Sequence, residues 1–251
     1  GIKVSAPMMR DTTDQYMDNY HMMDLTVMST LGIEASDIEA LGKLDEIKSI
    51  TGSYTIDTLA TIEGSQKVVK VHSLQSLSPE DDNFINKPRL IEGRWPSAPN
   101  ECLIDGTQLT RLPLEIGDSI TLSSGTDEDI SDVLENNQYK VVGVMNSPYY
   151  MHFGRGSAEI GNGSVSSYIY IPEENFKSDI YTELFITLKD TEQLDSYSDA
   201  YTTLIDDFKA KLEPIMEERA AVRYEKLLSD GKADITGGEA KLLEEKEKAN
   251  Q

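Results

Sequence analysis

The chain has 251 residues, enough for one large domain or two small ones, and its net charge is −22 from 45 acidic and 23 basic residues. A surface of this sign repels nucleic-acid phosphates and anionic lipid headgroups, so we expect no nucleic-acid partner. The acidity either keeps the chain soluble or attracts a cationic ligand, and the sequence leaves both open. No apolar run approaches about 18 residues, so no segment of this sequence is predicted to span a bilayer.

The first predicted element is a short amphipathic helix that follows Pro7. Residues 8–23 place four side chains at helical spacing, namely Met9, Thr13, Tyr16 and Tyr20. Its less polar face either packs on a core or offers an adaptable contact surface, as methionine-rich faces do.

A β-α-β unit is predicted next. Residues 24–30 alternate like a strand, and Ser36 and Glu39 match a capping box that would start a helix ending near residue 44. Residues 47–62 are rich in Ile, Thr and Tyr, which favours one long strand or two short ones. Another strand is predicted at residues 68–74.

The middle of the chain is predicted to be mostly β-structure. The strand signals are at residues 102–104, 119–122, 139–144 and 167–171, the last of which ends at Pro172. Cys102 is the only cysteine and lies in an apolar run, so we expect a buried thiol and no internal disulfide.

Residues 183–188 repeat the pattern of residues 24–28, and a helix is predicted after each. We therefore expect both strands in one sheet. The second helix is long, with an apolar stripe at Leu194, Tyr197, Tyr201, Leu204, Phe208 and Ile215. Three glycines then interrupt the pattern, and residues 231–251 are predicted to be a charged tail. Within it, residues 239–248 are too few to hold a helix in water on their own.

No side chains form a recognisable catalytic, cofactor-binding or metal-binding pattern, so we predict that the chain is not an enzyme. The acidic loop at residues 126–132 lacks the Gly and Glu that an EF-hand requires, and residues 154–159 lack the third Gly of a dinucleotide loop. The best candidates for contact with a ligand or partner are an aromatic group, Tyr149, Tyr150, His152 and Phe153.

Four motifs, in order, resemble the extracytoplasmic core domain of FtsX-like (MacB-type) ABC transporter permeases. They are IEGRWP at residues 91–96, NECLI at 100–104, GDSITL at 117–122 and YKVVGV at 139–144. Ile91 stands where that family more often has Leu.

The resemblance implies an α+β fold in two parts. A porter-like βαβ subdomain would join residues 21–66 to 178–230, and a mostly-β, sabre-like subdomain would be inserted at residues 67–177. Residues 1–20 would then be a membrane-proximal helix, and residues 231–251 the possible start of a coiled coil.

The resemblance also implies a location and partners. The domain would lie outside the cytoplasm on a permease in the cell membrane and relay ATP-driven motion of the membrane helices. Its partners would be a cytoplasmic ABC ATPase subunit, a second permease copy or paralogue, and an extracytoplasmic protein, peptide or lipid-linked substrate. The alternative is a cell-surface module that binds carbohydrate or peptide and has no role in transport.

Overall fold

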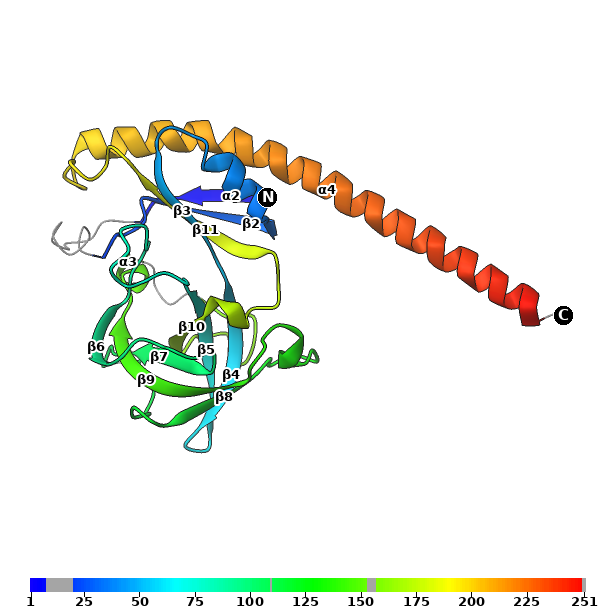
Figure 1. Ribbon diagram of the computed structural model, residues 1–251, viewed down its shortest axis with the longest axis horizontal. Coiled ribbons are helices and arrows are strands. Elements are labelled where there is room, and N and C mark those ends of the chain that lie inside the picture. Colours follow the sequence, from blue (N-terminus) through cyan, green and yellow to red (C-terminus); the bar gives the residue numbers. More distant parts are fainter. Residues whose placement is uncertain (8–19, 109, 153–156, 250–251) are drawn as a thin grey trace.

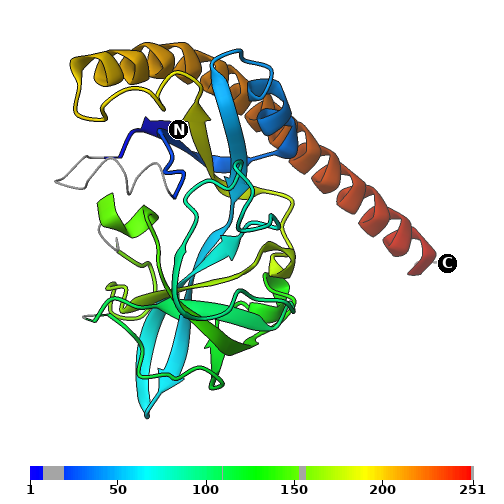
Figure 2. The same cartoon turned by 60° about the vertical axis from the view of Figure 1, so that its left-hand side comes forward.

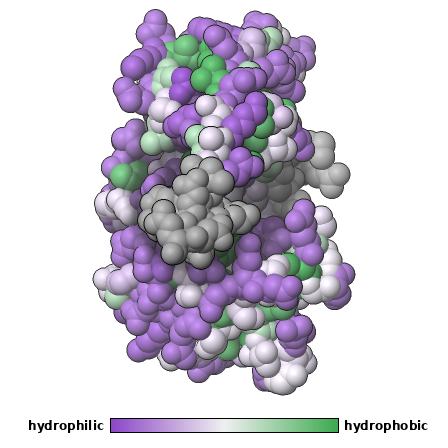
Figure 3. All heavy atoms as spheres, turned by 90° about the vertical axis from the view of Figure 1, so that its right-hand side faces the viewer, coloured by the Kyte–Doolittle hydropathy of each residue, from purple (hydrophilic) through white to green (hydrophobic). Residues whose placement is uncertain are grey.

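The computed structural model describes residues 1–7, 20–108, 110–152 and 157–249. A four-stranded sheet covered by one long helix forms one end of the molecule, and a larger all-β part forms the other end (Figures 1 and 2). This arrangement confirms the predicted α+β class. Figure 3 shows a predominantly hydrophilic face with small, scattered apolar areas, as the net charge of −22 leads one to expect.

The four-stranded sheet has the order β1-β2-β11-β3, and every neighbouring pair is antiparallel. Its strands are β1 (Ile2–Ser5), β2 (Leu25–Ile33), β3 (Ile47–Ser53) and β11 (Tyr181–Leu188). Val27 of β2 lies opposite Leu184 of β11, and both are fully buried. The prediction that residues 24–30 and 183–188 share one sheet is therefore confirmed.

The long helix, α4 (Asp199–Ala249), lies across this sheet (Figure 2). It packs one apolar stripe against the sheet. The buried residues of the stripe recur at intervals of three and four, and they are Tyr201, Ile205, Phe208, Leu212 and Met216. None of the helices in the described part of the chain is long and apolar enough to cross a membrane.

The prediction that glycines interrupt this helix is wrong, because α4 continues through Gly231, Gly237 and Gly238 to Ala249. Each glycine costs about 1 kcal/mol relative to alanine in a helix interior. The first turns of α4 are already held by the sheet, so the later turns need only propagation, which is much easier than nucleation. The residues between the glycines and after them are mainly good helix formers.

A second helix, α2 (Ala35–Leu41), lies between β2 and β3 and completes the predicted β-α-β unit. Its N-cap is Glu34, and the carboxylate of Asp37 accepts a hydrogen bond from the Glu34 backbone N–H (2.8 Å). The capping box therefore uses Glu34 and Asp37 instead of the predicted Ser36 and Glu39.

The all-β part is a seven-stranded sheet in which six strands close into a barrel. The order is β6-β9-β7-β10-β5-β4-β8, and β8 also pairs with β9, which closes the ring and leaves β6 attached outside it. Closure removes open strand edges. The strands are β4 (Thr55–Ile62), β5 (Ser65–Leu74), β6 (Arg89–Gly93), β7 (Glu101–Asp105), β8 (Ser119–Ser123), β9 (Gln138–Asn146) and β10 (Ser167–Pro172). Short helical segments, η1 (Ile130–Asp132), α3 (Tyr149–His152) and η2 (Glu173–Asn175), lie in the connections.

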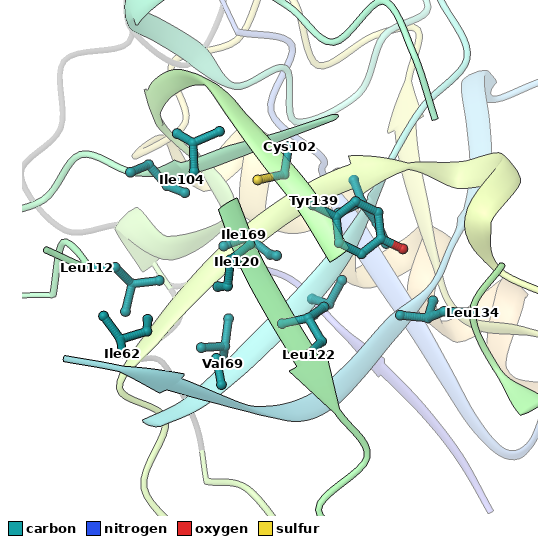
Figure 4. Packing of buried hydrophobic residues seen from close by; sticks show 14 of the residues in the cluster. Ile62, Val69, Cys102, Ile104, Leu112, Ile120, Leu122, Leu134, Tyr139 and Ile169 are labelled. Atoms are coloured by element: carbon teal, nitrogen blue, oxygen red, sulfur yellow. The ribbon is translucent and has the colours of Figure 1, made fainter. Parts of the chain in front are cut away.

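The interior of the barrel is a continuous apolar core (Figure 4). Residues from all six strands of the ring meet there, among them Val69, Cys102, Ile104, Ile120, Leu122, Tyr139 and Ile169. The buried thiol predicted for Cys102 is confirmed, since the residue is 0% exposed and has no disulfide partner.

The native protein is expected to leave Cys102 unmodified by iodoacetamide. Burial raises the pKa of this thiol to about 12, and the thiolate is the reactive form. Mass spectrometry should find no adduct in native buffer and one adduct per chain in urea, and a reductant should leave the melting temperature unchanged. Rapid labelling in native buffer would contradict the position of Cys102 inside the barrel.

The motifs that carry the family resemblance hold the barrel together. The guanidinium of Arg94 donates two hydrogen bonds to the carboxylate of Glu101 (2.8 and 2.5 Å), which joins the first motif to the second. This interaction lowers the pKa of Glu101 to about 2. Gly143 of the fourth motif is also required for space, because a Cβ there would lie 2.7 Å from the Arg94 carbonyl oxygen.

Two predicted boundaries need correction. Residues 55–62 were assigned to the first part, but β4 belongs to the barrel, so the division between the sheets lies at Tyr54 instead of residue 66. Ile2–Ser5 forms strand β1 instead of a helix, because it pairs with β2. The helix predicted at residues 8–23 falls mostly on residues 8–19, which lie outside the described residues, and residues 20–23 are not helical.

Candidate functional site

The chain passes from the four-stranded sheet into the barrel and back again, and these two crossings lie side by side. The outward crossing is the single residue Tyr54, between β3 and β4, and the return crossing is residues 173–180, between β10 and β11. Thr182 joins them, because its Oγ1 accepts a hydrogen bond from the Thr55 backbone N–H (2.9 Å) and donates one to the Ser53 carbonyl oxygen (2.9 Å). We call this region the junction.

An aromatic stack holds the outward crossing against the return crossing. The Tyr54 ring stacks on Phe176 with centroids 5.0 Å apart and packs against Tyr181 at 4.8 Å. The Tyr54 hydroxyl donates a hydrogen bond to the Ser178 carbonyl oxygen (2.6 Å). Gly52 makes room for this stack, since a Cβ there would lie 2.4 Å from the Tyr181 ring.

On another side of the junction, His72 of β5 lies at the centre of a tyrosine cluster. Its ring centroid is near those of Tyr149 (5.4 Å), Tyr150 (5.3 Å), Tyr168 (6.3 Å) and Tyr170 (5.1 Å). Its Nδ1 is 3.1 Å from Thr55 Oγ1, and its Nε2 bonds the Tyr150 hydroxyl. Burial lowers the pKa of His72 to about 3, so the imidazole is neutral over the physiological range.

Glu183 of β11 extends this hydrogen-bonded group from the barrel into the four-stranded sheet. Its carboxylate accepts hydrogen bonds from Thr55 Oγ1 (3.2 Å) and from the Tyr149 hydroxyl (3.3 Å). The residue is 3% exposed, and burial raises its pKa to about 7. An ionisable group with such a pKa shift, buried where the four-stranded sheet meets the barrel, is a candidate for function.

A second buried carboxylate fixes the start of α4 on the sheet. Asp24 accepts hydrogen bonds from the Tyr201 hydroxyl (2.9 Å), the Leu188 backbone N–H (2.7 Å) and Thr191 Oγ1 (2.9 Å). These bonds join β2, the end of β11 and the first turn of α4. Burial raises the pKa of Asp24 above its ordinary value.

Farther along α4, two ion pairs attach the helix to the N-terminal end of α2. Arg219 bonds the Asp37 carboxylate, and Arg223 lies 2.7 Å from Glu34. Residues after Arg223 whose side chains are described are exposed. The sheet, α2 and the first half of α4 are therefore tied together at both ends of their contact.

A groove of about 650 Å³ lies between α4 and the sheet, away from the junction. Its lining combines apolar side chains, among them Leu188, Leu204 and Phe208, with the carboxylates of Glu46, Asp190, Asp199 and Asp207 and with Lys211, which is paired with Glu46 (2.5 Å). The acidity of this lining matches that of the whole chain, so the charge does not distinguish the groove from the rest of the surface.

The structure places two of the four predicted contact residues at the junction. Tyr149 and Tyr150 lie in α3 and are partly buried, with their rings packed against each other at 5.1 Å and around His72. His152 is the last residue of α3, and its side chain lies outside the described part. Phe153 lies outside the described residues altogether.

No sequence motif indicated His72, Glu183 or Tyr54, although these residues make the main contacts at the junction. A usable signal was present in β11, where Glu183 is an acidic residue within a strand whose next residues are apolar. Alternating tyrosines in β10 were a second signal. Among the described residues, no group of three His, Cys, Asp or Glu could hold a metal ion.

Comparisons with known proteins find one family model and similar solved structures. A family model described as the MacB-like periplasmic core domain matches residues 7–204. The extracellular domain of the ABC-type transporter YknZ from Gram-positive bacteria is 14% identical, with a TM-score of 0.42, over 72% of this chain and 87% of that one. The periplasmic region of MacB from Actinobacillus actinomycetemcomitans is 12% identical, with a TM-score of 0.37, over 72% of this chain and 74% of that one. A comparison with curated proteins gives no significant match. Because the family model covers most of the chain and is the family that the four motifs resemble, the chain belongs to the MacB-like periplasmic core domain family.

Proposed function

We propose that this chain is the extracytoplasmic domain of an ABC transporter permease in the cell membrane, and that it relays movement of the membrane helices to a partner outside the cytoplasm. Family membership supports the first part of this proposal. The observation that carries the second part is the connectivity of the molecule. One long helix is tied to the sheet, and the sheet is joined to the barrel at a junction that has its own packing and hydrogen bonds.

The relay begins at α4. The helix is held on the sheet by a buried stripe, by the Asp24 hydrogen bonds and by the Arg219–Asp37 ion pair. Well-packed interiors deform little, so α4, α2 and the sheet should move as one body when the helix is displaced.

The junction converts this movement into a swing of the barrel. The chain crosses it at Tyr54 and at residues 173–180, which lie side by side, so rotation about the pair of crossings needs few backbone changes. The barrel is a closed ring with its own core, so it should turn as a rigid part.

A cytoplasmic ABC ATPase subunit would supply the driving force, and a second permease copy or paralogue would complete the assembly. The cargo or target would be an extracytoplasmic protein, peptide or lipid-linked molecule. The domain itself would perform no catalysis.

The relay can be tested in the complete permease with its ATPase by replacing Ala220 and Ala221 with glycine. These residues lie where α4 leaves the sheet, beyond the last buried residue of the stripe, Met216. Spin labels at Lys43→Cys and Gln66→Cys, both exposed, report the distance between the sheet and the tip of the β4–β5 hairpin. Trapping the ATPase with ATP and vanadate is expected to shift this distance in the parent protein. The glycine pair should abolish the shift and leave the ATPase rate unchanged.

The matched control replaces Ala220 and Ala221 with glutamine. Glutamine changes the same side chains and remains a good helix former, so the ATP-dependent shift should persist. A shift that survives the glycine pair would show that α4 does not transmit the movement. The absence of any shift in the parent protein would reject the relay itself.

A further inference from the structure

Glu183 is a buried acid that the relay, as described so far, does not use. It belongs to the four-stranded sheet, but the groups that bond its carboxylate are Thr55 at the start of the barrel strand β4 and Tyr149 in α3. Among the described residues, no lysine or arginine forms an ion pair with it. The cation that acts on it electrostatically is Lys70, which is bound to Asp57 (2.7 Å). One carboxyl group therefore holds three elements together without a cation to balance its charge.

The hydrogen bonds around Glu183 form a chain whose direction depends on its protonation. With Glu183 ionised, Tyr150 donates to His72 Nε2, His72 Nδ1–H donates to Thr55, and Thr55 donates to Glu183. In this arrangement each hydrogen bond has one donor and one acceptor, and His72 and Thr55 each accept one bond and donate the next. A neutral Glu183 instead carries an O–H group, which donates a hydrogen bond to one of its two neighbours, Thr55 or Tyr149. Donation to Thr55 turns that hydroxyl toward His72 and selects the other imidazole tautomer.

Burial of Glu183 disfavours its ionised form relative to its neutral form. An ionised carboxylate surrounded by aromatic rings loses hydration that two hydroxyl groups only partly replace, so closure of the junction favours the neutral acid. Of the titratable side chains on the neighbouring elements, Lys70 of β5, Tyr170 of β10, and Tyr149 and Tyr150 of α3 interact electrostatically with Glu183. Asp57 of β4 is paired with Lys70, and His72 of β5 is bonded to Thr55.

We propose that Glu183 is a proton-dependent latch of the junction. The neutral form of Glu183 holds the junction closed, and the ionised form loosens it. The regulation of transport by this latch rests on the proposed function, whereas the latch itself is a property of this chain alone. A movement passed from the sheet to the barrel would then be transmitted more stiffly on the acidic side of neutrality than on the alkaline side.

The sign of the linkage follows from the two states. The pKa of the Glu183 carboxyl is about 7 with the junction closed and near its ordinary value of 4.5 when the group is exposed. The closed state is therefore favoured below pH 4.5 and loses that advantage as the pH rises through 7. His72 acts oppositely. Its pKa is about 3 in the fold against 6.5 when exposed, so it weakens the closed state as the pH falls below 6.5. The test must separate the two residues.

Hydrogen–deuterium exchange of this chain and its Glu183→Gln variant makes that separation, because both contain His72. The peptides that report on the junction are those of β4 and β11, with β7 inside the barrel as the reference for intrinsic rates. The measured quantity is the exchange rate of the junction peptides in the parent chain divided by their exchange rate in the Glu183→Gln variant. This ratio is expected to rise about tenfold between pH 6 and pH 8.5, by linkage with the two Glu183 pKa values given above. Glu92→Gln, on the exposed strand β6, should leave the ratio flat.

A ratio that stays constant over this pH range would overturn the latch and leave the relay untouched, since the relay is tested by the glycine pair at Ala220 and Ala221. If Glu183→Gln does not fold, carbon-13 NMR of the parent chain decides the question. The Glu183 carboxyl carbon should then titrate near pH 7, with matching shifts of the Thr55 and Tyr149 signals. A midpoint below pH 5 would reject the latch.

Discussion

Phe208→Ala is expected to lower the free energy of unfolding by about 3–5 kcal/mol, the range for deletion of a large aromatic side chain from a core. Phe208 is 4% exposed and lies in the middle of the α4 stripe that packs on the four-stranded sheet. The loss combines the transfer of apolar surface with the cavity left behind. Urea unfolding followed by circular dichroism measures it.

The matched control for Phe208 is Tyr224→Ala on the same helix. Tyr224 is 51% exposed, so its removal should cost less than about 1 kcal/mol, the usual scale for surface changes. Equal losses for the two variants would mean that the stripe on α4 does not carry the packing of the sheet.

Asp24→Leu should destabilise the fold by about 3 kcal/mol. The side chain is 6% exposed and is the acceptor for the Tyr201 hydroxyl, the Leu188 backbone N–H and Thr191 Oγ1. Leucine leaves these buried donors unpaired, and each such group costs about 1–3 kcal/mol. Removal of a buried charge offsets part of that cost, so we expect a loss of stability well below the sum of the costs of the three unpaired donors.

Two further variants make the Asp24 result specific. Asp24→Asn keeps one acceptor oxygen and should lose clearly less stability than the leucine variant. Asp190→Leu makes the same change at an exposed position just beyond β11 and should have little effect. An Asp24→Leu protein as stable as the parent would show that these hydrogen bonds do not fix α4 on the sheet.

The sequence predicted the strands well where apolar and polar residues alternate, but it did not locate the boundary between the two sheets. Residues 47–62 are rich in Ile and Thr on both sides of Tyr54, and Gly52 and Ser53 still belong to β3, so these turn-type residues do not mark a visible boundary. The partners decide it: β4 pairs with the next strand, β5, in a hairpin, whereas β3 pairs with β11, which lies more than a hundred residues later in the sequence. The pairing of β3 with β11 is not encoded locally.

The candidate site was predicted only in part for a related reason. Tyr149 and Tyr150 stood out as an aromatic pair near glycines, which is a local feature of the sequence. Their partners are His72 and two tyrosines of β10, which the barrel brings to the same place. A polar residue in a strand, such as His72 or Glu183, shows its importance only when the fold reveals that it is buried.

The insertion of the barrel between β3 and β11 has a consequence for the order of folding. Every strand of the ring lies within residues 55–172, so a chain made from its N-terminus has the whole barrel available before β11 and α4 exist. Closing a flexible loop of roughly a hundred residues would carry a large entropic penalty. The folded barrel removes much of it, because its first and last strands, β4 and β10, flank β5 and deliver both crossings to the same place. Formation of the four-stranded sheet then becomes a nearly local event, although its strands are far apart in the sequence.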